Sequence, residues 1–284
     1  MPEYGILKLP RKDILTYPEL HRLVNILKKS GFTKFRFTGG EPFVRNKSMD
    51  FFESIDLKEF SITTNLALPD LEVERINKLP LKSINISCDS LKAQRYEYIT
   101  RGGDLKIFLN NLAGLKVKNI KLNVVLIKNF NEDEIYDFIN FAKEKNLTVR
   151  FIEKMDIIKD NLQFVSLETL KKRLINENVI SEKGDYIEHS VAVYHHLKDN
   201  SNIKIGFITP VSHPFCAYCN KIRIKANGDI KLCIYSNRTY NIRDILRQET
   251  DDNKIIKWLE NIIKLKPYSS FNELREEPMS QIGG

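Results

Sequence analysis

The sequence is poor in cysteine and has no long hydrophobic run. Only four of its 284 residues are cysteine, and no apolar segment approaches the roughly 18 residues of a membrane-spanning helix. No low-complexity segment occurs, and nothing at the beginning of the chain resembles a secretory signal. Because disulfides need an oxidising compartment, the cysteines are expected to be reduced, and we expect a cytoplasmic protein with no membrane partner.

Basic residues are in excess but form no continuous block. The net charge is +8 and the isoelectric point is about 9.1, which suits an anionic ligand such as a polyphosphate or a nucleic acid. Lysine and arginine are scattered among acidic residues, so much of the lysine is expected on a solvated surface. With 42% hydrophobic residues, the chain can build one large domain or a domain with an appendage.

Three of the four cysteines lie close together in a C-x2-C-x13-C pattern, at Cys216, Cys219 and Cys233. Two short strands, Ile222–Lys225 and Asp229–Ile234, are predicted to form a hairpin around an Asn-Gly turn. A CxxC turn lets two thiolates reach one ion, and the hairpin can bring the third into reach. The pattern predicts a metal or cluster site.

Two kinds of site fit this spacing. A structural zinc site would recruit His213, three residues before the first cysteine of the pattern, and close a tetrahedron of three cysteines and one histidine. An iron–sulfur cluster held by three thiolates would leave one iron open to a ligand, which is a catalytic feature. Spacing alone does not separate the two.

The first half of the chain alternates between strand and helix patterns. A helix is predicted to begin at Thr16 with a capping box to Glu19, and to end at Gly31. The further predicted strands are Lys34–Thr38, Glu59–Asn65, Lys82–Asp89, Ile120–Ile127 and Leu147–Glu153, and the further predicted helices are Lys47–Ser54, Leu71–Asn77, Leu91–Val117 with a break at Gly102-Gly103, and Asn131–Lys145. Regular alternation predicts a parallel sheet, either open and doubly wound or curved into a barrel.

Every predicted strand carries polar residues at alternate positions. They are Lys34, Arg36 and Thr38; Ser61, Thr63 and Asn65; Asn85, Ser87 and Asp89; Lys121 and Asn123; and Arg150. A sheet covered by helices on both faces would not tolerate a polar face, whereas a barrel can turn it inward around a ligand. Three of these residues, Arg36, Lys121 and Arg150, are cationic, with Lys34 as a fourth candidate, and the acids Asp89 and Glu153 are too few to neutralise them. We therefore expect a multiply anionic ligand.

The segment Gly39-Gly40-Glu41-Pro42 follows a predicted strand, where barrel enzymes place their chemistry. Two glycines allow close approach of the backbone to a ligand, and the amides and the carboxylate can bind charged groups. Taken alone, the segment would indicate only a tight turn shaped by glycine and proline.

An ordered series of motifs covers essentially the whole chain. It comprises Phe37-Thr38-Gly39-Gly40-Glu41-Pro42, Thr63-Thr64-Asn65, Asn85-Ile86-Ser87-Cys88-Asp89-Ser90-Leu91, Lys121-Leu122-Asn123-Val124-Val125, Arg150-Phe151-Ile152-Glu153-Lys154-Met155, the cysteine pattern and a terminal Gly283-Gly284. In this order, the motifs resemble the GTP 3',8-cyclase family of radical SAM enzymes, lyases of molybdenum cofactor biosynthesis.

The resemblance implies an α/β fold, a partial (β/α)6 radical SAM barrel over residues 1–189, with a C-terminal cluster-binding region and Gly-Gly tail over residues 190–284. In the family, a [4Fe-4S] cluster on an N-terminal CxxxCxxC motif cleaves S-adenosylmethionine. The deoxyadenosyl radical takes a hydrogen from C3' of GTP, and the ribose radical attacks C8 of guanine to give 3',8-cyclo-7,8-dihydro-GTP. A second [4Fe-4S] cluster binds the guanine base.

The resemblance also implies roles for individual residues. S-adenosylmethionine would contact Gly40, Ser87 and Met155, and the second cluster would be bound by Cys216, Cys219 and Cys233. The residues implied to hold GTP, mainly by its triphosphate, are Lys34, Arg36, Thr63, Lys121, Arg150, Lys221 and Arg223. The terminal Gly283 and Gly284 would reach into the site and assist catalysis. The implied partners are GTP, S-adenosylmethionine, an electron donor and a downstream cyclic pyranopterin monophosphate synthase, with no nucleic acid.

Two features depart from the family pattern. Lys221 stands where the family usually has arginine, which keeps the charge but loses the planar fork. Met1-Pro2-Glu3 matches the residues directly after the N-terminal cysteine motif, so the first barrel strand and those cysteines lie outside the sequence given. Cys88, a lone thiol in a strand, is expected to be a packing residue. We expect the chain from Met1 alone to be inactive and the upstream gene sequence to encode the CxxxCxxC motif.

A second class of function remains open from the sequence. The chain could be a non-catalytic nucleotide-binding protein, or a zinc-stabilised nucleic-acid-binding protein, that resembles the enzyme family without sharing its reaction.

Overall fold

The computed structural model describes residues 10–155, 164–186, 191–199, 202–214, 216 and 219–268. The strands are β1 Arg36–Phe37, β2 Phe60–Thr64, β3 Leu81–Ser87, β4 Ile120–Leu126, β5 Thr148–Glu153, β6 Asp185–Tyr186, β7 Val193–His196, β8 Lys204–Ile208, β9 Arg223–Ile224, β10 Asp229–Lys231 and β11 Tyr240–Asn241. The α-helices are α1 Tyr17–Lys29, α2 Ser48–Ser54, α3 Val73–Ile76, α4 Ala93–Thr100, α5 Leu105–Gly114, α6 Ile135–Lys145, α7 Leu167–Asn176, α8 Arg243–Gln248 and α9 Asp252–Ile263, with short 3-10 turns at Arg11–Asp13 and Glu132–Glu134.

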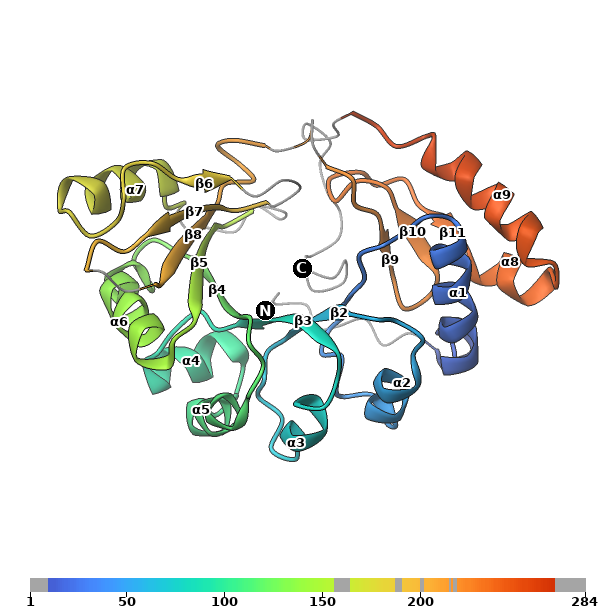
Figure 1. Cartoon of the computed structure of the whole chain (residues 1–284), viewed down its shortest axis with the longest axis horizontal. Helices are drawn as coiled ribbons and strands as arrows, with labels where there is room; N and C mark the ends of the chain where they lie inside the picture. The colour runs from blue at the N-terminus through green and yellow to red at the C-terminus, as the bar shows by residue number, and fades with distance from the viewer. Residues whose placement is uncertain are drawn as a thin grey trace.

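The main sheet has eight strands in the order β1-β2-β3-β4-β5-β8-β7-β6. Strands β1 to β5 and β8 run parallel, whereas β7 and β6 are antiparallel to their neighbours. The sheet curves into an open arc, and helices α2 to α7 lie along its outer side (Figure 1). The expected mixed α/β fold with a curved parallel sheet is confirmed, as are the predicted elements up to residue 153, although β1 is shorter than predicted.

The convex face of the sheet is apolar and carries the main hydrophobic core. Fully buried residues alternate along the strands, for example Ile84 and Ile86 in β3 and Leu122 and Val124 in β4, and they pack against the surrounding helices. Because side chains of a strand alternate between the two faces, the intervening polar residues point to the concave side. The polar face predicted from the sequence is therefore the inside of the arc.

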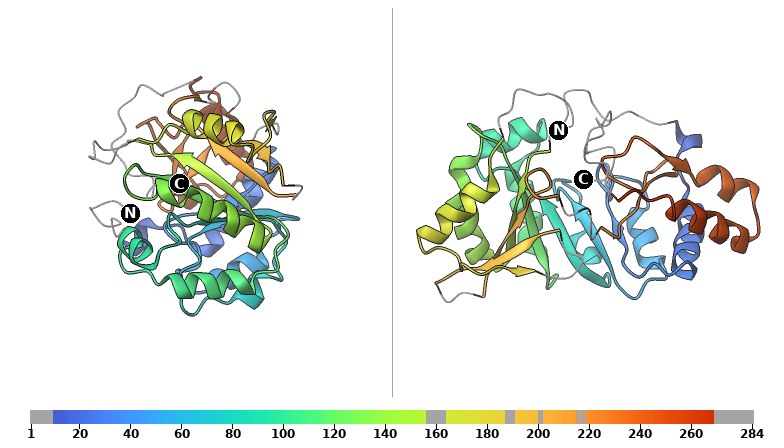
Figure 2. Two further views of the ribbon diagram at one scale, coloured as in Figure 1. Left: turned by 90° about the vertical axis from the view of Figure 1, so that its left-hand side faces the viewer. Right: turned by 90° about the horizontal axis from the view of Figure 1, so that it is seen from above.

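A second hydrophobic core joins the two ends of the described chain. Helix α1, with Leu23, Ile26 and Leu27, packs against residues of β10, α8 and α9 that include Ile230 and Leu259. Figure 2 shows α1 beside α9 and the three-stranded sheet β11-β10-β9 at one end of the arc. The predicted capping box between Thr16 and Glu19 at the start of α1 is confirmed.

The region after residue 153 was largely missed by the periodicity of the sequence. Strands β7 and β8 extend the main sheet, and α8 and α9 cover the small one. The predicted hairpin of the cysteine region is confirmed as β9 and β10. The proposed division between residues 189 and 190 stays a prediction. No helix in the described ranges has the length and apolarity needed to cross a bilayer.

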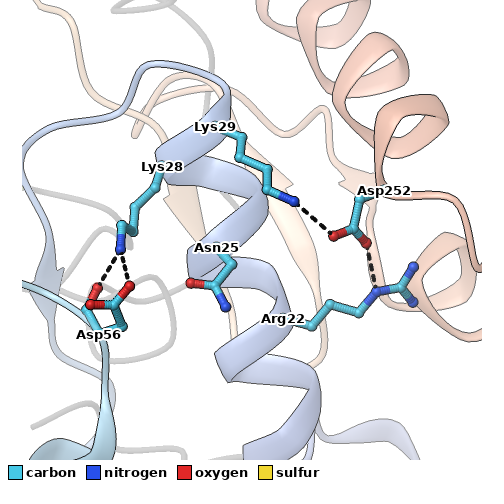
Figure 3. Close-up of a pocket in the computed structure, with 6 residues that line it drawn as sticks. All are labelled: Arg22, Asn25, Lys28, Lys29, Asp56 and Asp252. Carbon is cyan, nitrogen blue, oxygen red and sulfur yellow. Dashed lines mark hydrogen bonds and ion pairs between the residues drawn. The ribbon is translucent and has the colours of Figure 1, made fainter.

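Arg22 of α1 connects the ends of α8 and α9. Its Nη1 and Nη2 donate to the carbonyl oxygens of Leu246 and Glu249, each at 2.7 Å, and its Nε donates to Asp252 at 2.9 Å. These contacts satisfy carbonyl groups at the end of α8 that have no partner within the helix. Arg22 and Asp252 also line a surface pocket of about 520 Å³ beside α1, in which Lys29 approaches Asp252 (Figure 3). This pocket is a structural junction.

Replacing Arg22 by alanine should destabilise the protein by about 1 to 3 kcal/mol, because three charge-assisted contacts between α1, α8 and α9 are lost together. Chemical denaturation measures the loss. Lys29→Ala is the matched control: its side chain is 60% exposed and its single ion pair is 3.5 Å long, so the change should cost less than about 0.5 kcal/mol. Equal costs for the two variants would contradict the structural role of Arg22.

Candidate active site

The register of the parallel strands places polar side chains next to one another on the concave face. Thr63 of β2 is paired with Asn85 of β3, and Asn85 is paired with Lys121 of β4. Further along, Asn123 of β4 is paired with Arg150 of β5. Residues paired across adjacent strands share a face. Five residues from four strands therefore form one polar surface.

Arg36 joins this surface from the edge strand. It is paired with Ser61 of β2, whose hydroxyl lies 3.0 Å from that of Ser83 in β3. Lys34, the fourth candidate cation, is exposed and precedes β1 by two residues, so no strand pairing holds it in this row.

Arg150 is the most deeply buried cation of the surface, and 5% of the residue is exposed. Its Nε donates to Asn123 Oδ1 at 2.8 Å, and its Nη2 donates to Asn85 Oδ1 at 2.6 Å. Burial lowers the pKa of Arg150, and the hydroxyl of Tyr194 in β7 opposes this shift, partly through a hydrogen bond. The side chain thus reaches from β5 across β4 to β3.

Desolvation, and for two of the cations repulsion as well, lowers the pKa values on the concave face. Burial, and then the charges of Arg150 and Arg36, lower the pKa of Lys121 to about 8. The pKa of Arg36 falls to about 10, mainly through desolvation and then through Arg150, although solvent still reaches the Arg36 side chain. Within the described residues, no carboxylate forms an ion pair with Arg36, Lys121 or Arg150. The described part of this surface is therefore positive, with no carboxylate paired to these three side chains.

Cations of the cysteine region belong to the same electrostatic site. Burial, together with the charges of Arg36 and Arg223, lowers the pKa of Lys221 to about 8 against the opposing effect of Cys219. Burial also lowers the pKa of Arg223, against the opposing effect of Cys219 and Cys233. Since Arg36 acts on both Lys121 and Lys221, the small sheet contributes to the positive field of the concave face.

The Gly39-Gly40-Glu41-Pro42 segment is fixed to the carboxyl end of β2. Glu41 Oε1 accepts from Thr64 Oγ1 at 2.7 Å, and its Oε2 accepts from the backbone amide of Asn65 at 2.8 Å. Burial raises the pKa of Glu41. Gly39 has φ +154°, which few other residues tolerate, and both Gly39 and Gly40 are exposed to solvent. The glycines are thus presented by a firmly held loop.

The three residues expected to contact S-adenosylmethionine lie at one edge of the sheet. Gly40 follows β1, Ser87 is the last residue of β3, and Met155 follows β5. Carboxyl ends of parallel strands meet at the same edge of a sheet. Nearby, Asp89 accepts from the amide of Val125 at 2.8 Å, and burial raises the pKa of Asp89 to about 6.

The chemistry of the cysteines fits a cluster, but their convergence stays a prediction. None of the four cysteines, all of which are described, is in a disulfide. The amide of Cys219 donates to the carbonyl of Cys216 at 3.1 Å, and the thiols of Cys219 and Cys233 both act on Arg223. In the described part of the chain, no three potential metal ligands form a ready-made group, with or without His213.

Other predicted residues fall outside this geometry. Gly283 and Gly284 lie outside the described residues. Cys88 is 2% exposed, burial raises the pKa of its thiol, and its Sγ donates to the carbonyl of Ser90, so the expected packing role is confirmed. Tyr194 was missed, because its strand does not follow the strand–helix alternation that revealed β1 to β5.

Models of two families match consecutive parts of the chain. The Radical SAM superfamily model matches residues 4–142, and the model described as Molybdenum Cofactor Synthesis C matches residues 147–271. The structure of Streptococcus suis SuiB has a TM-score of 0.58 at 16% identity over 92% of this chain and 65% of SuiB. SuiB bound to S-adenosylmethionine has a TM-score of 0.52 at 18% identity, over 84% of this chain and 59% of SuiB. The curved sheet is the fold of radical SAM proteins.

Curated relatives define the family more narrowly. The GTP 3',8-cyclase of Alkaliphilus metalliredigens is 37% identical over 302 residues, covering 100% of this chain and 92% of the relative. The GTP 3',8-cyclase of Syntrophomonas wolfei is 33% identical, with the same coverage. The chain belongs to the GTP 3',8-cyclase family.

Replacing Arg36 by glutamine should raise the pKa of Lys121 above about 8, because one repelling charge is removed. The titration of the Lys121 side chain, followed by NMR of its labelled Cε, measures the shift, and Arg75→Gln on the outer helix α3 should leave it unchanged. An unaltered midpoint in the Arg36 variant would contradict the shared site.

The lowered pKa of Lys121 also predicts the direction in which the free energy of unfolding changes with pH. Between pH 8 and 10.5 the unfolded chain binds more protons at Lys121 than the folded protein does. The contribution of Lys121 to the free energy of unfolding should therefore rise with pH in this window.

Proposed function

We propose that the protein converts GTP to 3',8-cyclo-7,8-dihydro-GTP in molybdenum cofactor biosynthesis, with S-adenosylmethionine as the source of the radical. Family membership supports the reaction class. One structural observation carries the assignment of the substrate: Arg36, Lys121 and Arg150 meet on the concave face from three strands, with no carboxylate ion pair in the described residues.

The triphosphate of GTP is proposed to lie against these cations. A triphosphate offers several anionic oxygens, and charge-assisted hydrogen bonds to arginine and lysine are the strong contacts for such groups. The charge of Arg150 lowers the affinity of both Arg36 and Lys121 for protons, so an anion bound among these side chains would relieve a repulsion that exists before binding. Thr63 adds a hydroxyl next to Asn85, and Lys34 is proposed to reach the same ligand from the exposed edge.

The guanine end is proposed to face the cysteine region. Cys216, Cys219 and Cys233 would hold a [4Fe-4S] cluster, which, when bound, would supply an open iron for the base. Lys221 and Arg223 lie in the field of these thiols, since Cys219 acts on the pKa of both. They would orient the nucleotide between the two ends of the site and keep the concave face positive.

S-adenosylmethionine is proposed to bind at the carboxyl edge of the strands. Gly40 would allow close approach of its polar groups, Ser87 would donate or accept a hydrogen bond, and Met155 would contact its apolar parts. A second cluster, an electron donor, a downstream cyclic pyranopterin monophosphate synthase and a catalytic contribution of Gly283 and Gly284 complete the proposal from the family resemblance.

Binding measurements test the substrate assignment. GTP should bind more tightly than guanosine, and Arg150→Ala should weaken GTP binding by roughly 1.5 to 3 kcal/mol, since it removes a charge-assisted contact. Calorimetric titration measures both. Arg75→Ala removes an arginine of the outer helix α3 that is already paired with Asp50, Glu53 and Glu72. GTP affinity should therefore be retained. Equal affinities for guanosine and GTP would overturn the phosphate site.

Metal analysis tests the cluster assignment. Protein purified and reconstituted without oxygen should contain iron and sulfide, and Cys233→Ser should lower both, because one of three thiolates is lost. Cys88→Ser should retain them, since Cys88 is buried outside the cysteine region. Zinc in place of iron, lost on His213→Ala, would support a structural site instead.

A further inference from the structure

Arg150 is a buried cation held by neutral partners. The two acceptors at 2.6 and 2.8 Å are the amide oxygens of Asn85 and Asn123. A carboxylate at either position would form a stronger hydrogen bond to the guanidinium, but it would also cancel the positive charge. Asn85 is fully buried, so an acceptor at this position cannot be replaced by water. The amides fix the guanidinium and leave its charge intact.

Gly206 of β8 provides the space in which the Arg150 side chain lies. It is paired with Arg150 on one side and with Tyr194 on the other, so the three residues form one row on the concave face. A Cβ atom at Gly206 would lie 2.8 Å from Arg150 Cγ and 3.0 Å from Tyr194 Cε1. The φ of Gly206 is outside the left-handed region, so its backbone conformation does not require glycine. The need for glycine here comes from the side chains on both sides.

We propose that Asn85, Asn123 and Gly206 are positioning residues that hold Arg150 in a fixed orientation, with its charge uncompensated, for the triphosphate. This inference rests on the GTP site proposed above and adds residues that need not touch the nucleotide. A guanidinium that is already ordered loses little conformational entropy when an anion binds. Neither asparagine engages its Nη1 group.

The first variant changes charge without changing shape. Asn85→Asp keeps an acceptor opposite Arg150 Nη2 and gives up only the donor contacts of Asn85 to Thr63 and Ile62, which are both 3.4 Å long. The new carboxylate should pair with Arg150 and neutralise it. Affinity for GTP and for inorganic tripolyphosphate should fall about tenfold or more, while affinity for guanosine should stay within about twofold.

The second variant changes shape without changing charge. Gly206→Ala places a methyl group against Arg150 Cγ and Tyr194 and should displace the guanidinium. The pattern of affinity changes should match that of Asn85→Asp: weaker binding of tripolyphosphate and GTP, and little change for guanosine. The matched controls are Asn25→Asp, which adds the same charge on the exposed side of α1, and Gly114→Ala at the end of α5. Both should bind all three ligands as the wild type does.

The outcomes separate this inference from the proposed function. A wild-type protein that does not prefer GTP over guanosine refutes the GTP site itself. If the wild type prefers GTP but both variants bind GTP and tripolyphosphate within about twofold of it, the positioning role is refuted and the function stands. Parallel losses for guanosine also refute it, because they indicate general damage. Melting temperatures report folding, and Asn123→Asp replaces Asn85→Asp if the latter does not fold.

Discussion

Mutual repulsion among cations on one face of a sheet is the constraint that shapes this protein. Desolvation disfavours the protonated forms of Arg36, Lys121 and Arg150, and the charge of Arg150 adds to this effect at Arg36 and Lys121. The apolar packing of the convex face holds the strands in register, and the register holds the cations together. The stabilising and the destabilising parts of the fold are thus the two faces of the same sheet.

The second core extends this positive surface beyond the main sheet. Helix α1 packs against β10, α8 and α9, and the amide of Leu15 donates to Ala226 in the hairpin turn at 2.8 Å. Lys266, after α9, donates to the carbonyl of Lys221 at 2.8 Å. These contacts fix the cysteine hairpin relative to the main sheet, which lets Arg36 influence the pKa of Lys221. A segment before β1 and a segment near the end of the described chain therefore orient the same part of the site.

Sequence periodicity was sufficient to predict the strands of the regular strand–helix alternation, β1 to β5. Polar residues at every second position, such as Asn85 and Ser87, identified the concave face, because a one-residue step reverses the face of a strand. Strands β7 and β8 gave no such signal. After Lys204, strand β8 has no polar side chain and carries Gly206 at the informative position, and β7 pairs antiparallel with it without an intervening helix. The role of Gly206, which has no side chain, becomes clear only when the positions of Arg150 and Tyr194 are known. The spacing of the cysteines likewise predicts which side chains could bind a metal or cluster, but it does not show that the three thiols meet at one site.

The choice of neutral acceptors around Arg150 explains why the sheet tolerates a site that works against its own stability. A carboxylate at Asn85 or Asn123 would relieve the repulsion permanently, and the protein would then compete with its own ligand for the guanidinium. Amide oxygens satisfy the hydrogen bonds of the buried arginine, which avoids the cost of unpaired donors, while the repulsion from Arg150 that lowers the pKa of Lys121 persists. No carboxylate among the described residues removes this remaining repulsion, whereas a bound anion would. The energy left uncompensated in the free protein is therefore available to ligand binding, and it favours ligands that carry several negative charges close together.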